Sequence, residues 1–206
     1  DQISEINTEP LAIILEPVRR NTAPAITIAA IKAIEYYKEK KIDPILLILS
    51  SDHYIEDVDA FQKSIQKSID AAKKGGLVIF GIMPSHPATG YGYIKAEKEL
   101  KINNYLPEKV EKFIEKPDLK TARLLFENKK YSWNSGMFVS KASSILQELS
   151  KFAPKIVDNC EQCLKKSYYD LDFLRLDKLS FSKCIDIAID VAVFENTKKA
   201  YVLPLD

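Results

Sequence analysis

The chain has 206 residues, of which 46% are hydrophobic and 29% charged, so it has enough apolar material to bury a core of its own. Its 30 basic and 29 acidic residues leave a formal net charge of +1, which disfavours a nucleic acid as its partner. The chain has 6 glycines, none of them before Gly75, and no window has the closely spaced glycines of a Walker or dinucleotide-binding loop.

The cysteines and the apolar runs indicate where the protein works. Cys160, Cys163 and Cys184 are too few for a disulfide framework, which fits a reducing compartment. The N-terminal residues lack the basic and apolar regions of a secretory signal, and the longest aliphatic run, Ile45–Leu49, is far shorter than the ~18 residues of a membrane span. We therefore expect a cytoplasmic protein with no membrane association.

The first half of the chain alternates strands and helices, as is typical of an α/β fold. Continuous apolar runs predict strands buried on both faces of a parallel sheet at Leu11–Leu15, Ile45–Leu49 and Leu77–Phe80. Apolar residues at helical spacing predict a helix over Asn21–Lys41, capped by Asn21 or Thr22. They predict a second helix that is capped by Asp59 and ends at Gly75–Gly76.

The second half has a different pattern, with strands first and helices afterwards. Strands are predicted at Tyr91–Ala96, Lys109–Glu115, Ser132–Ser140 and Tyr201–Leu203. A helix is predicted over Leu119–Asn128, and helices dominate from Lys141 to Phe194. No linker is evident, so residues 1–206 are predicted to form a single domain.

Segments that follow predicted strands are candidate binding sites, because ligands on open α/β sheets bind beyond the carboxyl ends of the strands. In Glu16–Pro24, helix N–H groups and two arginines can receive an anion or a polar base edge, although a capped helix with solvated arginines explains the segment equally. In Ser50–His53, Asp52 can hold Mg²⁺, although a lone Asp after a strand is more often a turn or cap residue.

Three further segments carry chemistry that a ligand site needs. The glycines of Thr89–Tyr93 allow close approach of a ligand to the backbone, although a plain hairpin turn explains them equally. The Glu and Lys of Phe113–Pro117 can hold a sugar hydroxyl and a phosphate, although most such pairs are solvated surface. A glycine inside the predicted strand at Trp133–Met137 indicates close packing of ligand or backbone.

The Cys160-x-x-Cys163 pair is predicted to lie in a helix, with both thiols on one face. No second cysteine pair or nearby histidine accompanies it, so we expect buried structural cysteines rather than a zinc or redox site.

The order of the motifs along the chain is more specific than any one of them. They resemble the successive motifs of the mannose-1-phosphate guanylyltransferases, a family of sugar nucleotidyltransferases. The similarity runs from about Leu11 to the last residue and rests on Leu15–Ala25, Ser51–His53, Gly90–Ile94, Phe113–Asp118, Trp133–Phe138, Ile185–Asp186 and Val202–Asp206.

The resemblance implies a fold, a reaction and a set of site residues. The fold is an α/β, Rossmann-like nucleotidyltransferase mixed sheet flanked by helices. The reaction joins GTP and α-D-mannose 1-phosphate with Mg²⁺ to give GDP-mannose and pyrophosphate, and a homodimer is compatible with the resemblance. The catalytic residues would be Asp52, which holds the metal, and Lys116. The nucleotide would contact Glu16, Arg20, Asn21, Thr22 and Ala23, and the sugar phosphate would contact Gly92, Glu115, Lys116 and Asn134.

Departures from the family pattern leave alternatives open. Arg19 stands where the family usually has glycine. The family's glycine-rich loop and its Gly-Trp-Ser-Asp-Val-Gly segment are expected before Asp1 and after Asp206, so we expect this chain to be the central part of the catalytic domain and inactive on its own. The alternatives are a non-catalytic sugar-phosphate-binding or regulatory module, and the same chemistry with another sugar 1-phosphate.

Overall fold

A computed structural model describes residue 5 and residues 8–205, apart from the side chain of residue 103. Asp206, the last residue of the final motif, lies outside this range. The elements in chain order are β1 (Ile13–Leu15), α2 (Thr22–Tyr37), β2 (Ile45–Ile48), α3 (Val58–Lys73), β3 (Leu77–Ile82), β4 (Tyr93–Ala96), η1 (Ile102–Asn104), β5 (Glu108–Ile114), α4 (Leu119–Phe126), β6 (Tyr131–Lys141), α5 (Ala142–Phe152), α6 (Pro154–Lys165), β7 (Tyr168–Asp170), β8 (Phe173–Arg175), α7 (Lys178–Phe181), the π-helical turn η2 (Asp190–Phe194) and β9 (Ala200–Leu205).

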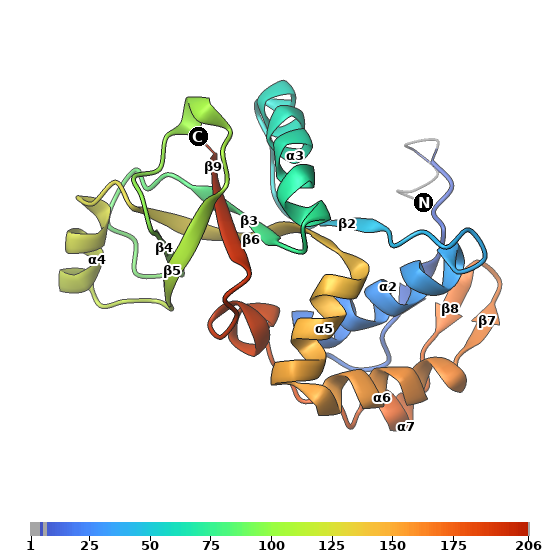
Figure 1. The fold of residues 1–206 in the computed structure, drawn as a ribbon. Helices are drawn as coiled ribbons and strands as arrows, with labels where there is room; N and C mark the ends of the chain where they lie inside the picture. Colours follow the sequence, from blue (N-terminus) through green and yellow to red (C-terminus); the bar gives the residue numbers. More distant parts are fainter. Residues whose placement is uncertain (1–4, 6–7, 206) are drawn as a thin grey trace.

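The larger of the two sheets has six strands in the order β2-β6-β3-β9-β5-β4. Strands β3 and β9 are parallel, and the other pairs are antiparallel. Strand β4 also pairs with β6, so the pairings return to β6 and the sheet closes on itself at this end. Figure 1 shows β6 running through the middle of the molecule, from the side where α4 lies toward α5.

The predicted parallel sheet is wrong, although each of its three strands exists. Strand β1 lies in a separate sheet of order β1-β8-β7, where it runs parallel to β8, and β2 pairs antiparallel with β6. Neither β1 nor β2 is buried on both faces. The β7–β8 hairpin, which is not predicted, lies in the region where helices are expected to dominate. A short apolar run indicates a strand, but it does not indicate which strand is its partner.

Helices cover both faces of the larger sheet, which confirms the α/β prediction. Leu77 and Ile79 of β3 belong to a core shared with α2, α5 and α6. Val78 and Phe80 point to the other face, where Phe61 of α3 packs edge-on against Phe80 with ring centroids 5.3 Å apart. Because successive strand residues alternate between the faces, a strand this apolar must be covered on both sides.

The observed helix caps and the burial of the cysteines match the predictions from the sequence, except for the cap of α3. The Asn21 side chain caps α2, as predicted, whereas α3 is capped by Asp57 rather than by Asp59. Cys160 and Cys163 are fully buried on α6, and burial raises the pKa of Cys163 to about 11. Their predicted burial is thus confirmed. A thiol with such a pKa is almost entirely protonated at neutral pH.

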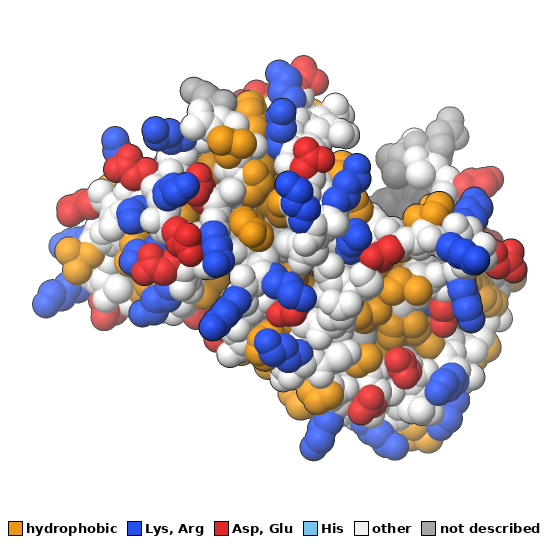
Figure 2. All heavy atoms as spheres, in the orientation of Figure 1, with side chains coloured by type: hydrophobic (Ala, Val, Ile, Leu, Met, Phe, Trp, Pro, Cys, Tyr) orange, Lys and Arg blue, Asp and Glu red, His pale blue; other side chains and the backbone are white. Residues whose placement is uncertain are grey.

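The surface charges and the lengths of the helices bear on possible partners. On the face shown in Figure 2, basic and acidic side chains are interspersed over most of the surface. No helix among the described residues is long and apolar enough to cross a membrane.

Candidate functional site

The candidate site lies where β2 and β4 meet different parts of one edge of β6. Strand β2 pairs with residues 138–141 of β6, and β4 pairs with residues 131–133. The stretch Asn134–Met137 lies between these two pairings. The Ser50–His53 loop leaves the end of β2 here, and a Cβ at Gly136 would lie 3.9 Å from Ser50 Oγ. The register of β6 therefore brings the predicted Asp52 loop toward the Trp133–Met137 motif.

Three predicted sugar-site residues are direct neighbours. Because Tyr93 pairs with both Ile114 and Trp133, Gly92 lies opposite Glu115, the residue after β5, and opposite Asn134 on β6. The Asn134 N–H donates to the Gly92 carbonyl at 2.8 Å. A Cβ on Gly92 would lie 2.8 Å from Glu115 Oε2 and 3.7 Å from the Cβ of Asn134. The structure thus assembles a carboxylate, an amide and a bare backbone segment, groups that can hydrogen-bond sugar hydroxyls.

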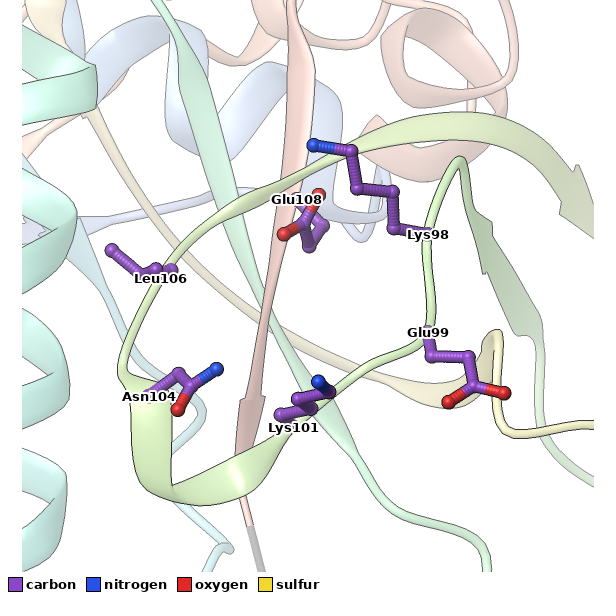
Figure 3. A pocket seen from close by; sticks show the side chains of 6 residues that line it. All are labelled: Lys98, Glu99, Lys101, Asn104, Leu106 and Glu108. Carbon is purple, nitrogen blue, oxygen red and sulfur yellow. The ribbon is translucent and has the colours of Figure 1, made fainter.

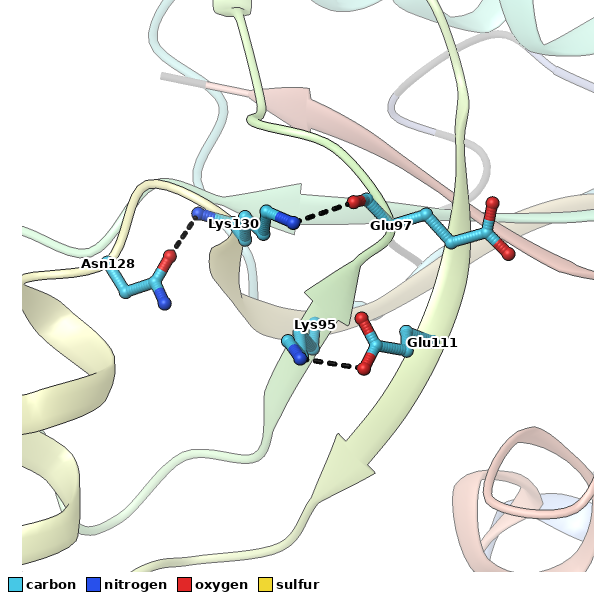
Figure 4. Close-up of polar contacts among 5 residues, drawn as sticks. All are labelled: Lys95, Glu97, Glu111, Asn128 and Lys130. Carbon is cyan, nitrogen blue, oxygen red and sulfur yellow. Dashed lines mark hydrogen bonds and ion pairs between the residues drawn. The ribbon is translucent and has the colours of Figure 1, made fainter.

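Polar contacts connect β4 and the residue after it to β5 and to the residue before β6, as Figure 4 shows. Lys95 Nζ on β4 lies 2.7 Å from Glu111 Oε1 on β5, and the Lys130 ammonium donates to the carbonyl of Glu97 at 2.9 Å. Both contacts tie β4 to its neighbours a few residues from Gly92, so they help to keep Gly92 opposite Glu115.

Lys116 lies next to the sugar-site residues in a strained backbone conformation. Its φ is 37°, a region that L-residues rarely occupy, and its ammonium lies 3.4 Å from Glu115 Oε1. The side chain is exposed, so its ammonium can be reached by an anionic group from solution although it is paired with Glu115. Backbone strain of this kind persists where the surrounding structure imposes it, often at functional sites.

The amide of Asn134 has a further partner that the sequence motifs do not include. Its Nδ2 donates to Asp190 Oδ1 at 2.9 Å, and its Oδ1 accepts from the Gly136 N–H at 3.1 Å. Burial and the negative charge of Glu115 raise the pKa of Asp190. Asp190 therefore belongs to the same cluster as Glu115 and Asn134.

The motif match at Ile185–Asp186 does not include Asp190. Both Ile185 and Asp186 are exposed. The dipeptide Ile-Asp occurs twice in this part of the chain, at residues 185–186 and 189–190, so the match itself cannot choose between them. The available signal is the apolar run Val191–Phe194 after the second copy, which indicates a buried segment.

The predicted nucleotide segment is largely engaged with other parts of the chain. Arg20 Nη2 donates to the Ser182 carbonyl at 2.7 Å, and Thr22 Oγ1 accepts from the Ile189 N–H at 2.9 Å. Ala23 is fully buried, and its N–H donates to the carbonyl of Ile187 at 3.2 Å. These contacts pin the start of α2 to the segment that leads into Asp190.

The expectation of free N–H groups at the start of α2 needs correction. The Thr22 N–H donates to Asn21 Oδ1 at 3.0 Å and the Ala23 N–H also has an acceptor within the chain, so neither is free to receive an anion. Asn21 itself is exposed and has a φ of 62°, a second strained position among the predicted site residues. Nucleotide contacts of Arg20, Asn21, Thr22 and Ala23 stay predictions.

Glu16 borders a separate hollow at the end of the smaller sheet where β1 and β8 end and β7 begins. This cavity of about 380 Å³ is also lined by Pro17, Lys166, Tyr168 and Arg175. Partial burial raises the pKa of Glu16. A carboxylate at the rim of a cavity can accept hydrogen bonds from a polar ligand, which keeps Glu16 a candidate for the nucleotide end of the site.

Asp52 lies at the mouth of a larger cavity of about 800 Å³. Its lining includes His53, Asp57, Trp133 and Asn134, and the ring of Tyr91 lies 5.0 Å from that of Trp133. Asp52 is exposed, and no group of three or more His, Cys, Asp or Glu side chains that could hold a metal occurs within the described part of the chain. One exposed carboxylate fits Mg²⁺ only as part of a site completed by phosphate oxygens and water.

A hollow near β4 and β5 contains no predicted site residue. Figure 3 shows a cavity of about 210 Å³ around the turn η1, with Lys98, Lys101 and Glu108 among its lining residues. It follows β4 in the chain and lies apart from the cluster around Gly92.

A mixed sheet with helices on both faces defines this chain as an α/β protein. A family model described as "Nucleotidyl transferase" matches residues 1–182, and the chain belongs to this family. The prediction of a nucleotidyltransferase fold is confirmed.

Curated relatives match the chain over its whole length. It is 46% identical to the xanthan biosynthesis protein XanB of Xanthomonas campestris pv. campestris (strain B100) over 206 residues, which are 42% of that protein. It is 45% identical to the mannose-1-phosphate guanylyltransferase RfbM of Salmonella typhimurium (strain LT2), again over 42% of that protein. The chain thus spans less than half the length of these relatives.

Solved structures with a similar fold are also known. A crystal structure titled mannose-6-phosphate isomerase, from Helicobacter pylori, has a TM-score of 0.82 and 32% identity, covering 99% of this chain and 77% of that one. One titled mannose-1-phosphate geranyltransferase, from Thermus thermophilus, has a TM-score of 0.79 and 24% identity, covering 98% and 55% of the two chains. The second similarity supports the fold alone.

Proposed function

We propose that the protein carrying this chain transfers a guanylyl group from GTP to α-D-mannose 1-phosphate, giving GDP-mannose and pyrophosphate. The observation that carries the proposal is the cluster of Gly92, Glu115 and Asn134, with Lys116 at its edge and the Asp52 loop on the same side of β6. The name of a relative that is 45% identical over the whole chain, mannose-1-phosphate guanylyltransferase, favours GTP and mannose 1-phosphate over other pairs.

In the proposed reaction, a phosphate oxygen of the sugar phosphate attacks the α-phosphorus of GTP. The bond between this phosphorus and the oxygen that bridges to the β-phosphorus breaks, and pyrophosphate leaves with that bond's electrons. The attacking oxygen is already anionic, so no general base is required. The protein has to align the two substrates and offset their charge.

The residues divide this work according to their chemistry. Glu115, Asn134 and the backbone of Gly92 hold the hydroxyls of the hexose, and the Lys116 ammonium binds its phosphate. The segment from Glu16 to Ala23 lies at the nucleotide end. Asp52 would hold Mg²⁺, which offsets the negative charge of the phosphate oxygens when it is bound.

We further propose that residues 1–206 belong to one nucleotidyltransferase domain and that the protein acts in the cytoplasm, without a membrane or nucleic-acid partner. The balanced net charge of +1 and the interspersed surface charges support the absence of a nucleic-acid partner. A homodimer is the proposed assembly, and sedimentation of the purified protein tests it.

The reaction is tested by pyrophosphate release from the purified protein with a panel of nucleoside triphosphates and hexose 1-phosphates. We expect GTP with mannose 1-phosphate to be the best pair and a chelator to abolish turnover. If this pair is inert while another pair reacts, the substrate assignment is wrong. Binding of mannose 1-phosphate without turnover of any pair would favour the non-catalytic module.

Lys116→Ala provides a residue-level test of the same proposal. Loss of the ammonium is expected to lower kcat/KM by about 100-fold or more, the range for removing one donor to transition-state charge. Lys112→Ala is the matched control, because Lys112 is an exposed lysine on β5, four residues before Lys116. Equal effects of the two substitutions would contradict a specific role for Lys116.

A further inference from the structure

Asp190 sits at the start of a π-helical turn that is fixed from both sides. The Glu195 N–H donates to the Asp190 carbonyl at 2.9 Å, the five-residue spacing of a π-turn. Phe194, at the end of the turn, packs edge-on against Phe138 of β6 with ring centroids 5.0 Å apart. On the other side, the Ile189 N–H donates to Thr22 Oγ1 at the start of α2. A π-turn is a rare local geometry that often occurs at functional sites.

The Asn134 amide is oriented by its two partners. A side-chain amide has two N–H donors and a carbonyl oxygen with two lone pairs. Asp190 Oδ1 takes one donor at 2.9 Å, and the Gly136 N–H occupies one lone pair at 3.1 Å. A carboxylate only accepts and a backbone N–H only donates, so the two contacts exclude the flipped amide. One N–H and one lone pair remain for a ligand.

The position of this amide bears directly on the sugar site. Asn134 lies opposite Gly92, and its Cβ would be 3.7 Å from a Cβ at Gly92. A freely rotating amide would offer a hexose hydroxyl either a donor or an acceptor. A fixed amide offers one pattern, and preorganised groups lose less entropy when the ligand binds.

We propose that Asp190 is a positioning residue of the sugar site: by holding the Asn134 amide from a π-turn anchored to α2 and β6, it presents one fixed donor and acceptor to the hexose of the sugar 1-phosphate. The proposal rests on the proposed function for the identity of the ligand. Asp190 does not itself touch the reacting phosphates; it acts through Asn134.

A double-mutant cycle tests the proposal in the protein that carries this chain. Asp190→Ala is expected to lower kcat/KM for mannose 1-phosphate by about tenfold to 100-fold, the range for a charge-assisted hydrogen bond. The KM for GTP is expected to stay within about twofold. In an Asn134→Ala background, Asp190→Ala is expected to add less than about twofold, because coupled residues are not additive. Effects that multiply in the double variant would overturn the proposal.

Two further variants separate positioning from a general structural role. Asp190→Asn keeps an oxygen that can accept from Asn134 Nδ2, and it is expected to retain activity within about threefold, a loss smaller than that of a hydrogen bond. A loss as large as that of Asp190→Ala would contradict the account. Glu195→Gln, at the exposed end of the same turn, is the control and should leave activity unchanged. Should Asp190→Ala fail to fold, Asp190→Ser, too short to reach Asn134, takes its place.

A readout that needs no turnover separates this inference from the proposed function. In NMR spectra, the side-chain amide signals of Asn134, identified by their loss in Asn134→Ala, should exchange slowly with water in the wild type and in Asp190→Asn, but rapidly in Asp190→Ala. If GTP with mannose 1-phosphate is inert yet the amide behaves in this way, the function is wrong and the positioning stands. An active enzyme whose Asn134 amide is unaffected by Asp190→Ala refutes the positioning.

Discussion

Gly92→Ala isolates the sugar site with a single added methyl group. The new Cβ would lie 2.8 Å from Glu115 Oε2, whereas ordinary contact begins at 3.4 Å, so the carboxylate has to retreat by about 0.6 Å. The Cβ contacts with Phe113 at 3.6 Å and with Asn134 at 3.7 Å are ordinary. The clash therefore falls on the end of one flexible side chain, and the fold should tolerate it.

The expected cost of Gly92→Ala is functional. A misplacement of about 1 Å in a binding group can cost about 100-fold, so a retreat of about 0.6 Å is expected to lower kcat/KM for the sugar phosphate by about tenfold or more. Steady-state kinetics of pyrophosphate release measure this effect, and thermal unfolding should show a nearly unchanged Tm.

Gly90→Ala is the matched control for Gly92→Ala. A Cβ at Gly90 meets nothing within 4 Å, so both activity and stability should be preserved. If Gly92→Ala retains full activity, or if Gly90→Ala loses as much, the assignment of Gly92 and Glu115 to the sugar site is refuted.

Two further predictions concern stability. In Gly81→Ala, the added Cβ would collide with Ser132 and lie 2.6 Å from Val202 Cγ2 inside the sheet, so we expect a loss of about 1–3 kcal/mol in the free energy of unfolding, measured with denaturant. A loss below about 0.5 kcal/mol would contradict the packing argument. The pKa of Asp190 is higher in the folded protein than in the unfolded chain. The free energy of unfolding therefore falls as the pH rises from the unfolded-state pKa to the folded-state pKa of Asp190. Asp190→Asn should therefore be more stable than the wild type at pH 7, and the difference should vanish near pH 3. Urea unfolding of both proteins at the two pH values measures this difference. If the difference is the same at both pH values, the pKa of Asp190 is not shifted.

Local sequence signals locate most elements of the fold. The predicted strand at Ser132–Ser140 corresponds to β6 (Tyr131–Lys141), and the predicted helix at Leu119–Asn128 corresponds to α4 (Leu119–Phe126). Asn21 is one of the two predicted caps of α2 and is the one observed. A cap can be predicted because its side chain bonds to residues that follow it in the chain. Such features depend on contacts between near neighbours in sequence.

Strand partners and the β7–β8 hairpin could not be predicted in the same way. The run at Ile13–Leu15 reads as a strand, yet its partner is Phe173–Arg175, about 160 residues away. The hairpin strands β7 and β8 have only three residues each, too few to establish a period of two. Pairing between distant short strands depends on which edges remain free after the rest of the core has formed.

The candidate site also has features that the sequence predicts and features that depend on the tertiary structure. The sequence by itself determined which chemical groups the site contains, because each lies in a recognisable local motif. These groups are the backbone of Gly92, the carboxylate of Glu115, the ammonium of Lys116 and the amide of Asn134. Only the tertiary structure decided that Gly92 faces both Glu115 and Asn134, and that Asp190 rather than Asp186 reaches the amide. The reason is physical: a one-residue change of register turns every side chain of a strand to the other face, and the register of β4, β5 and β6 is fixed by contacts between segments far apart in the chain.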